Sequence, residues 1–252
     1  MKNRHDKILE VLTKNQRVEV AALADMLEVS QVTVRKDLDR LEERGLIRRR
    51  HGFASLESAD DVAMRLAYHY NTKRRIAAAA AAEVADGETV MIESGSCCAL
   101  LAEELANTKR DITIVTNSAF IASHIRHAQS AKTILLGGYY QKNTQVTVGP
   151  ITKACAEMFF ADTFFIGADG FSKEFGFTGK DHSRAQTVQD LAGTVARVAV
   201  LTESKKFSRQ GVVRLLRTER VAALYTDDRI PPDIAAFLRN RNVVVHTVGA
   251  SE

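Results

Sequence analysis

The chain has 252 residues, of which 45% are hydrophobic and 26% charged, and its net charge at pH 7 is +4. This composition excludes a disordered chain and suffices for one large domain or two unequal ones. The three cysteines, Cys97, Cys98 and Cys155, show no CxxC spacing, which disfavours a disulfide scaffold and a cysteine-ligated zinc site. Neither the N-terminus nor the alanine run 77–82 has the apolar length of a signal or membrane segment, so we expect a cytoplasmic protein without a membrane partner.

Three short helices are predicted at the beginning of the chain. Apolar residues recur at helical spacing in residues 4–14, 19–27 and 30–45, and Ser30 and Gly45 are suited to begin and end the third helix. The expected inward-facing residues are Ile8, Leu9, Leu12, Val20, Leu23, Met26, Leu27, Val34, Leu38 and Leu41. Three helices with a tight turn between the last two predict a helix-turn-helix.

Residues 46–56 follow as a small β-hairpin, the wing, with His51-Gly52 at its turn. Positive charge is concentrated here, because residues 44–52 hold four arginines and no acid, whereas twelve Lys and Arg meet eleven Asp and Glu over residues 1–60. On an isolated helix such a charge run is more often a solvated face. The acids that would balance it are Asp37, Asp39, Glu42 and Glu43.

The context favours double-stranded DNA as a partner. A helix fits the major groove, arginines beside it neutralise phosphates, and an arginine of the wing can enter a narrow minor groove. The expected DNA-contacting residues are Ser30, Gln31, Thr33, Arg35, Lys36, Arg40, Arg48, Arg49, Arg50 and His51.

From Lys73 onward, strand-like apolar runs alternate with helical stretches, which predicts an α/β domain with a mainly parallel sheet. The runs are residues 88–94, 111–117, 131–138, 162–170, 195–204, 220–227 and 242–248. We therefore expect a DNA-binding domain at 1–57, a linker with one short helical piece at 58–72, and an effector-binding and oligomerisation domain at 73–252.

Polar and glycine residues follow several of these strands, where α/β sheets bind ligands. Gly95 comes after the first strand and precedes a helix, and Asn117-Ser118 opens another helix after the second strand. Helix N-termini offer free N–H groups to anions. Gly137-Gly138, Asp169 and Lys206 have similar positions. Each is by itself more often a turn, a cap or a surface residue, but their joint position at strand ends predicts an anion site.

The segment VSQVTVRKDLDRLEERGLIRRRHG, residues 29–52, resembles the winged helix of the DeoR family of bacterial sugar-catabolism regulators. Further segments are similar, in order, to the effector-binding half of that family: KRRIAAAAA, IESGSCC, IVTNS, ILLGG, FFIGADGF and LTESKKF. The resemblance implies a winged helix-turn-helix followed by a ribose-5-phosphate isomerase-like α/β effector domain, and a phosphorylated sugar or related metabolite as the small-molecule effector.

The candidate effector-binding residues combine the strand-end positions with those that the resemblance implies. They are Glu93, Ser94, Gly95, Ser96, Cys97, Cys98, Asn117, Ser118, Gly137, Gly138, Asp169, Lys180, His182, Arg184 and Lys206. Departures from the family's usual residues occur at Phe53, Cys97, Cys98, Ser183, Arg184 and Glu203. Cations at 180, 182 and 184 would favour a ligand more negative than a simple sugar monophosphate. The adjacent thiols could form a redox sensor, but buried cysteines are the commoner case.

The sequence thus predicts a repressor of a carbohydrate-utilisation operon, without cofactor or metal, in which effector and operator binding are thermodynamically coupled. Paired half-sites would be read by a homodimer or homotetramer. Two alternatives are a sugar-phosphate isomerase-like enzyme with an accessory DNA-binding domain and a constitutive DNA-architectural protein. The segment HSRAQTV offers no carboxylate for an isomerase base, which disfavours the enzyme.

Overall fold

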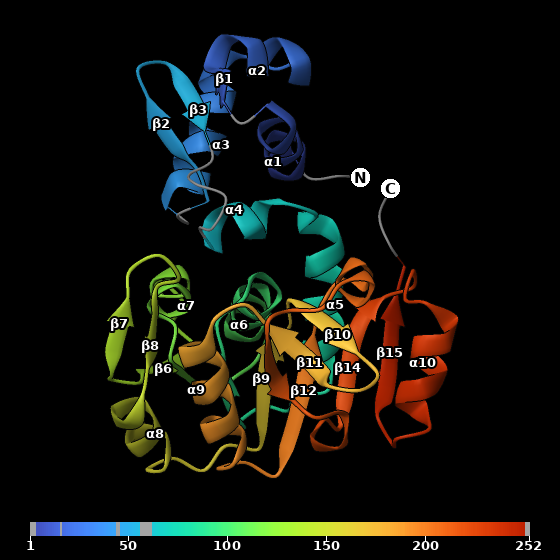
Figure 1. The fold of residues 1–252 in the computed structure, drawn as a ribbon. Helices are drawn as coiled ribbons and strands as arrows, with labels where there is room; N and C mark the ends of the chain where they lie inside the picture. Colours follow the sequence, from blue (N-terminus) through green and yellow to red (C-terminus); the bar gives the residue numbers. More distant parts are fainter. Residues whose placement is uncertain (1–3, 16, 44–45, 56–61, 250–252) are drawn as a thin grey trace. The chain divides into compact units, whose positions relative to one another are not determined.

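The structure is a computed structural model that describes residues 4–15, 17–43, 46–55 and 62–249, and the chain divides into two compact units, residues 1–71 and 72–252 (Figure 1). The interdomain boundaries expected at residues 57 and 72 remain a prediction. The linker expected at 58–72 includes a short helix, α4 (Val62–Ala67).

The first unit has the predicted helix-turn-helix and wing. Strands β2 and β3 form the wing hairpin, and the three-residue strand β1, which the sequence did not predict, pairs antiparallel with β3. Its elements are α1 (Arg4–Asn15), β1 (Arg17–Glu19), α2 (Val20–Leu27), α3 (Gln31–Glu43), β2 (Arg48–Arg50) and β3 (Phe53–Ser55). Gly45, the expected end of the third helix, lies outside the described residues.

Local chemistry explains the ends of these elements. The Ser30 hydroxyl oxygen accepts the backbone N–H of Thr33 at 3.2 Å, which confirms Ser30 as the cap of α3. His51 and Gly52 have φ of 49° and 82°, the paired positive values that a tight two-residue hairpin turn requires. The expected turn of the wing is therefore confirmed.

Ile8, Leu9, Leu12, Leu23, Val34, Leu38 and Leu41 are fully buried, as predicted. The prediction that Met26 faces inward is wrong, because 60% of its surface is exposed. Helix α2 buries Val20, Leu23 and Ala24 on one stripe, and Met26, six residues after Val20, lies about 120° from it around the helix axis, at the margin of that stripe.

The second unit is built on a seven-stranded sheet of order β15-β14-β12-β9-β4-β5-β6, in which every pairing is parallel. All seven strands fall within the runs expected from the sequence, so the predicted α/β class is confirmed. The strands are β4 (Thr89–Ile92), β5 (Ile112–Thr116), β6 (Ala131–Leu135), β9 (Thr163–Gly167), β12 (Arg197–Leu201), β14 (Ala223–Asp227) and β15 (Val244–Val248).

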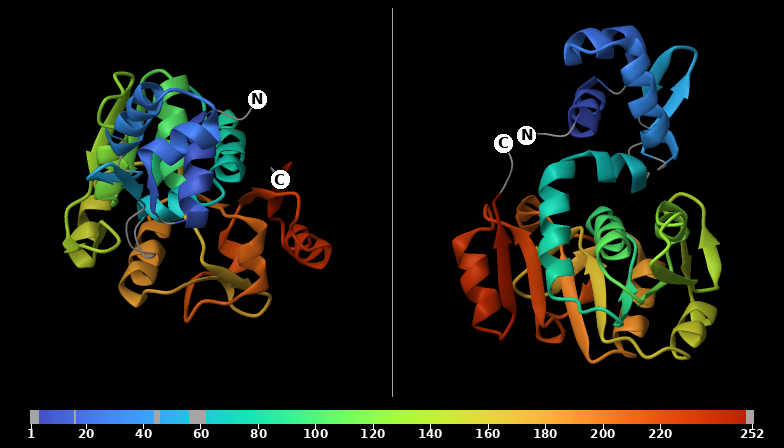
Figure 2. Two further views of the ribbon diagram at one scale, coloured as in Figure 1. Left: turned by 90° about the horizontal axis from the view of Figure 1, so that it is seen from above. Right: turned by 180° about the vertical axis from the view of Figure 1, so that it is seen from behind.

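Helices cover both faces of this sheet (Figure 2). Successive side chains of a strand point to opposite faces, so Phe164 and Ile166 join the core beneath α9 and α10, whereas Phe165 points to the face that α5 and α6 cover. The helices are α5 (Tyr70–Ala82), α6 (Ser96–Thr108), α7 (Ala119–His124), α8 (Pro150–Ala156), α9 (His182–Ala192) and α10 (Pro232–Arg239). Burial on both faces explains the nearly continuous apolar runs.

Five short strands of the second unit were not predicted from the sequence. Strands β7 (Tyr139–Gln141) and β8 (Val146–Val148) pair with each other, and β10 (Gly170–Ser172), β11 (Gly176–Gly179) and β13 (Val213–Leu216) form a small antiparallel sheet. Two short 3-10 helices, η1 (Ser204–Ser208) and η2 (Thr218–Arg220), complete the unit. Within the described ranges, no helix is long and apolar enough to span a membrane.

The strand order reverses beside β4. From β4 the chain adds β5 and β6 on one side, and then crosses to add β9, β12, β14 and β15 on the other. The topological switch point therefore lies between β4 and β9. In open parallel sheets, ligands bind outside the carboxyl ends of the strands at such a point. The segments that follow β4 and β9 are thus the first place to look for a ligand site.

Candidate functional site

The candidate DNA-contacting surface is the exposed side of α3 together with the wing. Gln31, Arg35, Lys36 and Arg40 are exposed, and Thr33 is half-buried beside its cap, Ser30. Their side of the helix is opposite the buried residues Val34, Leu38 and Leu41. The hydrophobic stripe thus fixes which side chains α3 can present to a groove.

The charge of Asp37 suggested that it balances the bases of α3 on the surface, but the structure places it in the interior. Its side chain is buried and accepts hydrogen bonds from Arg4 Nη2 at 3.1 Å and from His5 Nε2 at 3.0 Å. Burial alone would raise the pKa of Asp37, but the hydrogen bonds from Arg4 and His5 outweigh it and lower the pKa. Asp37 therefore ties α3 to α1, and the exposed side of α3 is less acidic than the sequence implied.

Arg49 joins the wing to α3. Its backbone N–H donates to Glu42 Oε1 at 2.8 Å, and its guanidinium pairs with Asp39. Phe53 stands where the family commonly has glycine. The guanidinium carbon of Arg17 lies over its ring, 4.0 Å from the ring centroid. Both contacts hold the hairpin in place, so a phosphate that engages Arg49 has to compete with Asp39.

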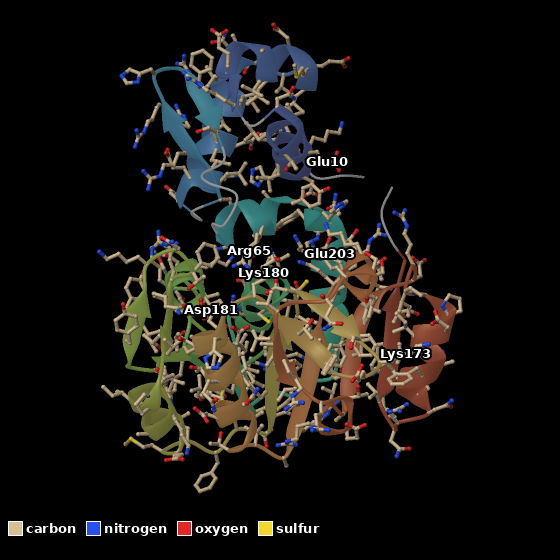
Figure 3. The ribbon with its side chains drawn as sticks, viewed as in Figure 1. Glu10, Arg65, Lys173, Lys180, Asp181 and Glu203 are labelled. Atoms are coloured by element: carbon tan, nitrogen blue, oxygen red, sulfur yellow. The ribbon has the colours of Figure 1, made fainter. Side chains whose placement is uncertain are left out.

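The second unit presents four acidic side chains along the carboxyl ends of four neighbouring strands. Glu93, Asp169, Glu203 and Asp227 follow or end β4, β9, β12 and β14. Each has polar partners: Arg184 for Glu93, Lys206 for Asp169, Lys73 and Lys205 for Glu203, and Ser204 for Asp227. We call this set of acids and their partners the strand-end row. Figure 3 shows Lys180, Asp181 and Glu203 at this end of the unit.

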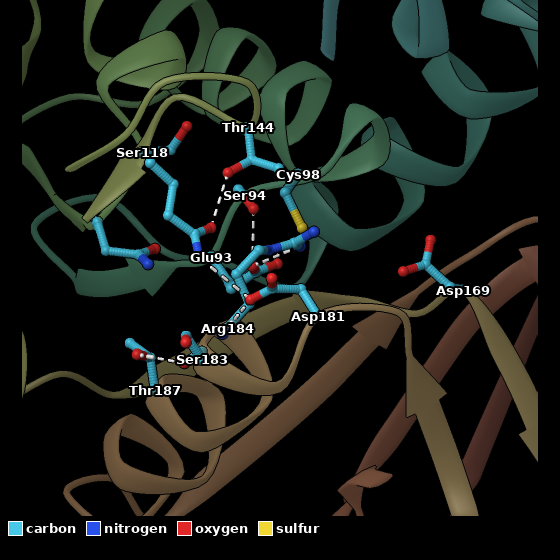
Figure 4. Close-up of polar contacts among 12 residues, drawn as sticks. Glu93, Ser94, Cys98, Ser118, Thr144, Asp169, Asp181, Ser183, Arg184 and Thr187 are labelled. Carbon is cyan, nitrogen blue, oxygen red and sulfur yellow. Dashed lines mark hydrogen bonds and ion pairs between the residues drawn. The ribbon is translucent and has the colours of Figure 1, made fainter. Parts of the chain in front are cut away.

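Glu93 and Arg184 form a buried ion pair at the switch point (Figure 4). Arg184 Nη2 donates to Glu93 Oε1 at 2.8 Å, and the side chains are only 14% and 2% exposed. The Ser94 hydroxyl donates to the same oxygen at 2.7 Å. Burial alone would lower the pKa of Arg184, but Glu93 outweighs it and raises the pKa. Glu93 Oε2 and Arg184 Nε have no partner among the described residues.

The structure does not bring Lys180, His182 and Arg184 together as a patch of free positive charge. Lys180 and His182 are exposed, whereas Arg184 turns inward to Glu93. Asp181 caps α9 by accepting the backbone N–H of Arg184 at 2.7 Å. These three residues therefore do not form the cationic patch from which a preference for an unusually negative ligand was expected.

Of the two helix N-termini predicted to hold an anion, only that of α6 lacks a side-chain cap. Its first residue follows Gly95, which has φ of 141° and forms no side-chain capping hydrogen bond. Ser118 already caps α7, because its hydroxyl oxygen accepts the N–H of Ile121 at 3.2 Å. Asn117 Nδ2 donates to the carbonyl oxygen of Thr147 at 2.9 Å, while its buried Oδ1 has no partner in the described chain.

Gly138 has a packing role. A Cβ at Gly138 would lie 2.0 Å from Thr152 Oγ1 and 2.9 Å from the carbonyl oxygen of Val148, so only glycine fits there. Thr152 also donates to the carbonyl oxygen of Gly137 at 2.7 Å. These contacts with α8 and β8 account for Gly138 without a ligand, whereas a Cβ at Gly137 would meet only ordinary contacts, 3.7 Å from Cys155 Sγ and 3.9 Å from Ile151 Cγ2.

The thiols of Cys97 and Cys98 are buried in the first turn of α6. Burial raises the pKa of Cys97 to about 12 and raises that of Cys98 well above its ordinary value. Such thiols stay protonated and react slowly, because the thiolate is the reactive form. The arrangement supports the interpretation as buried cysteines over a redox sensor.

Lys73, which is buried, and Lys206, which is half-buried, are two further cations of the strand-end row. Lys206 Nζ lies 3.9 Å from Asp169 Oδ1, and burial lowers the pKa of Lys206 to about 8. Lys73, from α5, was not among the predicted site residues, nor was its partner Glu203. Their segments KRRIA and LTESKKF were noted in the sequence, but no local pattern indicated that they meet.

Comparison with known families assigns both units. Residues 4–59 match the DeoR-like helix-turn-helix domain, and residues 68–228 match the DeoR C terminal sensor domain. The chain belongs to the DeoR family. The resemblance inferred from the sequence is thereby confirmed.

Curated relatives match this DeoR-family chain over nearly its whole length. The regulator GolR of Listeria innocua is 28% identical over 90% of this chain and 91% of its own. The glycerol-3-phosphate regulon repressor of Escherichia coli K12 is 27% identical over 95% of this chain and 96% of its own. These names indicate a transcriptional regulator and not an enzyme, as the sequence predicted.

Solved structures share part of the fold. Ribose 5-phosphate isomerase A of Methanocaldococcus jannaschii has a TM-score of 0.40 at 16% identity, covering 55% of each chain. A sor operon regulator of Shigella flexneri has a TM-score of 0.44 at 10% identity and covers 67% of this chain and 88% of its own. Likenesses of this size concern the fold alone and carry no argument about function.

Proposed function

We propose that this DeoR-family regulator represses a carbohydrate-utilisation operon and that a phosphorylated sugar or related anionic metabolite controls its binding to the operator. The observation that carries the proposal is the presence in one chain of a helix-turn-helix with a cationic exposed side and a sensor domain with a partly unsatisfied polar site at its switch point.

The DNA-contacting residues follow from the surface of the first unit. Exposed Gln31, Arg35 and Arg40 on α3 can reach base edges and phosphates, and the wing adds exposed Arg50 and His51. Arg49 contributes after exchanging Asp39 for a phosphate. Because α3 and the wing belong to one packed unit, their contacts would form together.

The ligand contacts are proposed around β4 and β9. The N-terminus of α6 can receive an anionic group, since the helix begins just after β4 and Gly95 provides no side-chain cap for its first turn. The buried acceptors Glu93 Oε2 and Asn117 Oδ1 need donors, and sugar hydroxyls supply them. The neutralised strand-end row favours a ligand with one phosphate and several hydroxyls over a ligand with additional carboxylates.

The assembly that we propose is a homodimer or homotetramer, because paired operator half-sites match a two-fold symmetric pair of winged helices. Effector would favour an arrangement that binds DNA less well. By linkage, operator DNA then weakens effector binding by the same factor. Relief of repression by the effector is the expected sign.

The test combines two binding measurements on the full chain. Fluorescence anisotropy with a duplex from the protein's own promoter should show tight binding at moderate ionic strength, and a thermal-shift screen of phosphorylated sugars should yield at least one that raises the melting temperature. That compound should release the duplex. Arg35→Ala should weaken operator binding by about 1–3 kcal/mol, whereas exposed Arg239→Ala in the sensor unit should not. Failure of the parent protein to bind promoter fragments, with or without phosphosugars, would overturn the proposal.

A further inference from the structure

Lys73 is buried but lies outside the ligand contacts proposed above. It lies on α5 (Tyr70–Ala82), the helix that begins within the first unit's residues and continues into the second. Its side chain is only 3% exposed. A lysine at such depth is rare unless an acid accompanies it.

Glu203, the acid that accompanies Lys73, also pairs with Lys205. Glu203 Oε2 lies 3.6 Å from Lys73 Nζ, and Glu203 Oε1 lies 3.1 Å from Lys205 Nζ. Lys205 is 38% exposed, so its pairing is more strongly screened by solvent than that of Lys73. One buried carboxylate thus pairs with two ammonium groups, of which that of Lys73 is the more deeply buried.

Lys73 also lies within electrostatic range of the first turn of α6. Burial is the main cause that lowers the pKa of Lys73, with Glu203 opposing it, and the positive charge of Lys73 in turn stabilises the thiolate form of Cys97. The charges of Lys73 and Glu203 also act on the pKa of Lys206, which Lys73 lowers and Glu203 raises. The uncapped helix N-terminus and three lysines therefore share one electrostatic neighbourhood.

We propose that Lys73 contacts the anionic group of the effector and that Glu203 holds this ammonium in the absence of ligand. This inference rests on the proposed function, which places a phosphate at the N-terminus of α6. A phosphate carries more negative charge and more acceptor oxygens than Glu203, so it competes for the same ammonium. Binding would exchange a carboxylate partner for a phosphate partner.

This exchange involves the helix that is continuous with the DNA-binding unit. Glu203 belongs to the loop after β12, whereas Lys73 belongs to the first turn of α5. When the phosphate replaces Glu203, the start of α5 is attached to the ligand and no longer to the β12 loop. A partner exchange of this kind gives α5 two discrete states, which is the element that coupling between two sites requires.

The test uses variants with opposite expected effects. The probe is inorganic phosphate, titrated against the full-length protein at constant ionic strength and followed by thermal shift and isothermal calorimetry. Lys73→Met removes the ammonium and should weaken phosphate binding at least tenfold, while Lys73→Arg should restore most of it. Glu203→Gln removes the competitor and should strengthen phosphate binding several-fold, although it destabilises the ligand-free protein.

Two controls separate partner exchange from other effects. Asp227→Asn removes a negative charge from the same edge, but Ser204 and not Lys73 pairs with Asp227, so its gain in affinity should be much smaller than that of Glu203→Gln. Lys173→Met breaks the exposed pair of Lys173 with Asp233 and should change nothing.

The outcomes distinguish the two proposals. If phosphate does not bind the parent protein, the proposed ligand site is wrong. If the parent binds phosphate but Lys73→Met binds it equally well, or Glu203→Gln binds it no better than Asp227→Asn does, the partner exchange is refuted. Operator release gives a second readout: at matched initial occupancy of the promoter duplex, added phosphate should release the duplex from the parent protein but not from Lys73→Met. Normal release from this variant would also refute the exchange.

Discussion

The buried ion pair between Glu93 and Arg184 allows a quantitative prediction. Arg184→Met keeps most of the side-chain volume but leaves Glu93, which is 2% exposed, with the Ser94 hydroxyl as its one side-chain partner among the described residues. Removing one member of a buried ion pair costs about 3–5 kcal/mol, because the remaining charge is desolvated without compensation. The hydroxyl that remains places the expected loss near the lower end, at about 3 kcal/mol.

Differential scanning calorimetry and urea unfolding, monitored by circular dichroism, measure this loss. For a unit of this size, about 3 kcal/mol corresponds to a decrease of roughly 6–12 °C in melting temperature. The transition to follow is that of the second unit, which has its own core. Lys173→Met is a control, because that pair is exposed and pairs of its kind contribute about 0–1 kcal/mol.

A double variant identifies the cause. Glu93→Gln combined with Arg184→Met removes both charges, keeps an acceptor for the Ser94 hydroxyl, and should recover most of the lost free energy of unfolding. If Arg184→Met costs less than about 1 kcal/mol, or if the double variant is no more stable than the single one, burial of an uncompensated Glu93 charge is not what the pair prevents.

Three further predictions concern other parts of the chain. Because the folded-state pKa of Asp37 is lowered, its stabilising contribution is present above its ordinary value of 3.8 and is lost as the pH falls through the lower folded value, so Asp37→Asn should flatten the acid limb of the stability curve of the first unit. Arg49→Ala should reduce the slope of log K against log salt by about 1, and Asp39→Asn should raise operator affinity by releasing Arg49; unchanged slopes and affinities would exclude a phosphate contact for Arg49. At pH 8, iodoacetamide should modify half-buried Cys155 before Cys98, as mass spectrometry would show, and rapid labelling of Cys98 in the folded protein would contradict its burial.

The elements that the sequence predicted best are those with a strong periodic pattern. The seven parallel strands are buried on both faces and therefore read as continuous apolar runs, and α3 combines a capping Ser30 with an inward stripe. The five antiparallel strands of the second unit and β1 of the first were missed because each has only three or four residues, too few to establish alternation, whereas β2 and β3 were indicated by the turn between them.

The candidate site was predictable in position but not in its pairings. Strand ends indicated where Glu93, Asp169 and Lys206 would lie, because parallel strands present their carboxyl ends on one edge. The partners come from helices distant in the sequence, so no local pattern showed that Arg184 turns toward Glu93 or that Lys73 reaches Glu203. The inward-facing prediction for Met26 was wrong for a different reason: the apolar residues of α2 extend beyond its buried stripe, and an apolar side chain at the margin of the stripe need not face inward.

The separation between a sheet buried on both faces and polar loops at its carboxyl edge has a consequence for how such sensors diversify. Substitutions in the strands would disturb close packing, whereas substitutions after the strands alter only which donors and acceptors meet the metabolite. Substitutions at a handful of loop and helix-terminus positions can therefore change the contacts to the metabolite without disturbing the packed sheet beneath them.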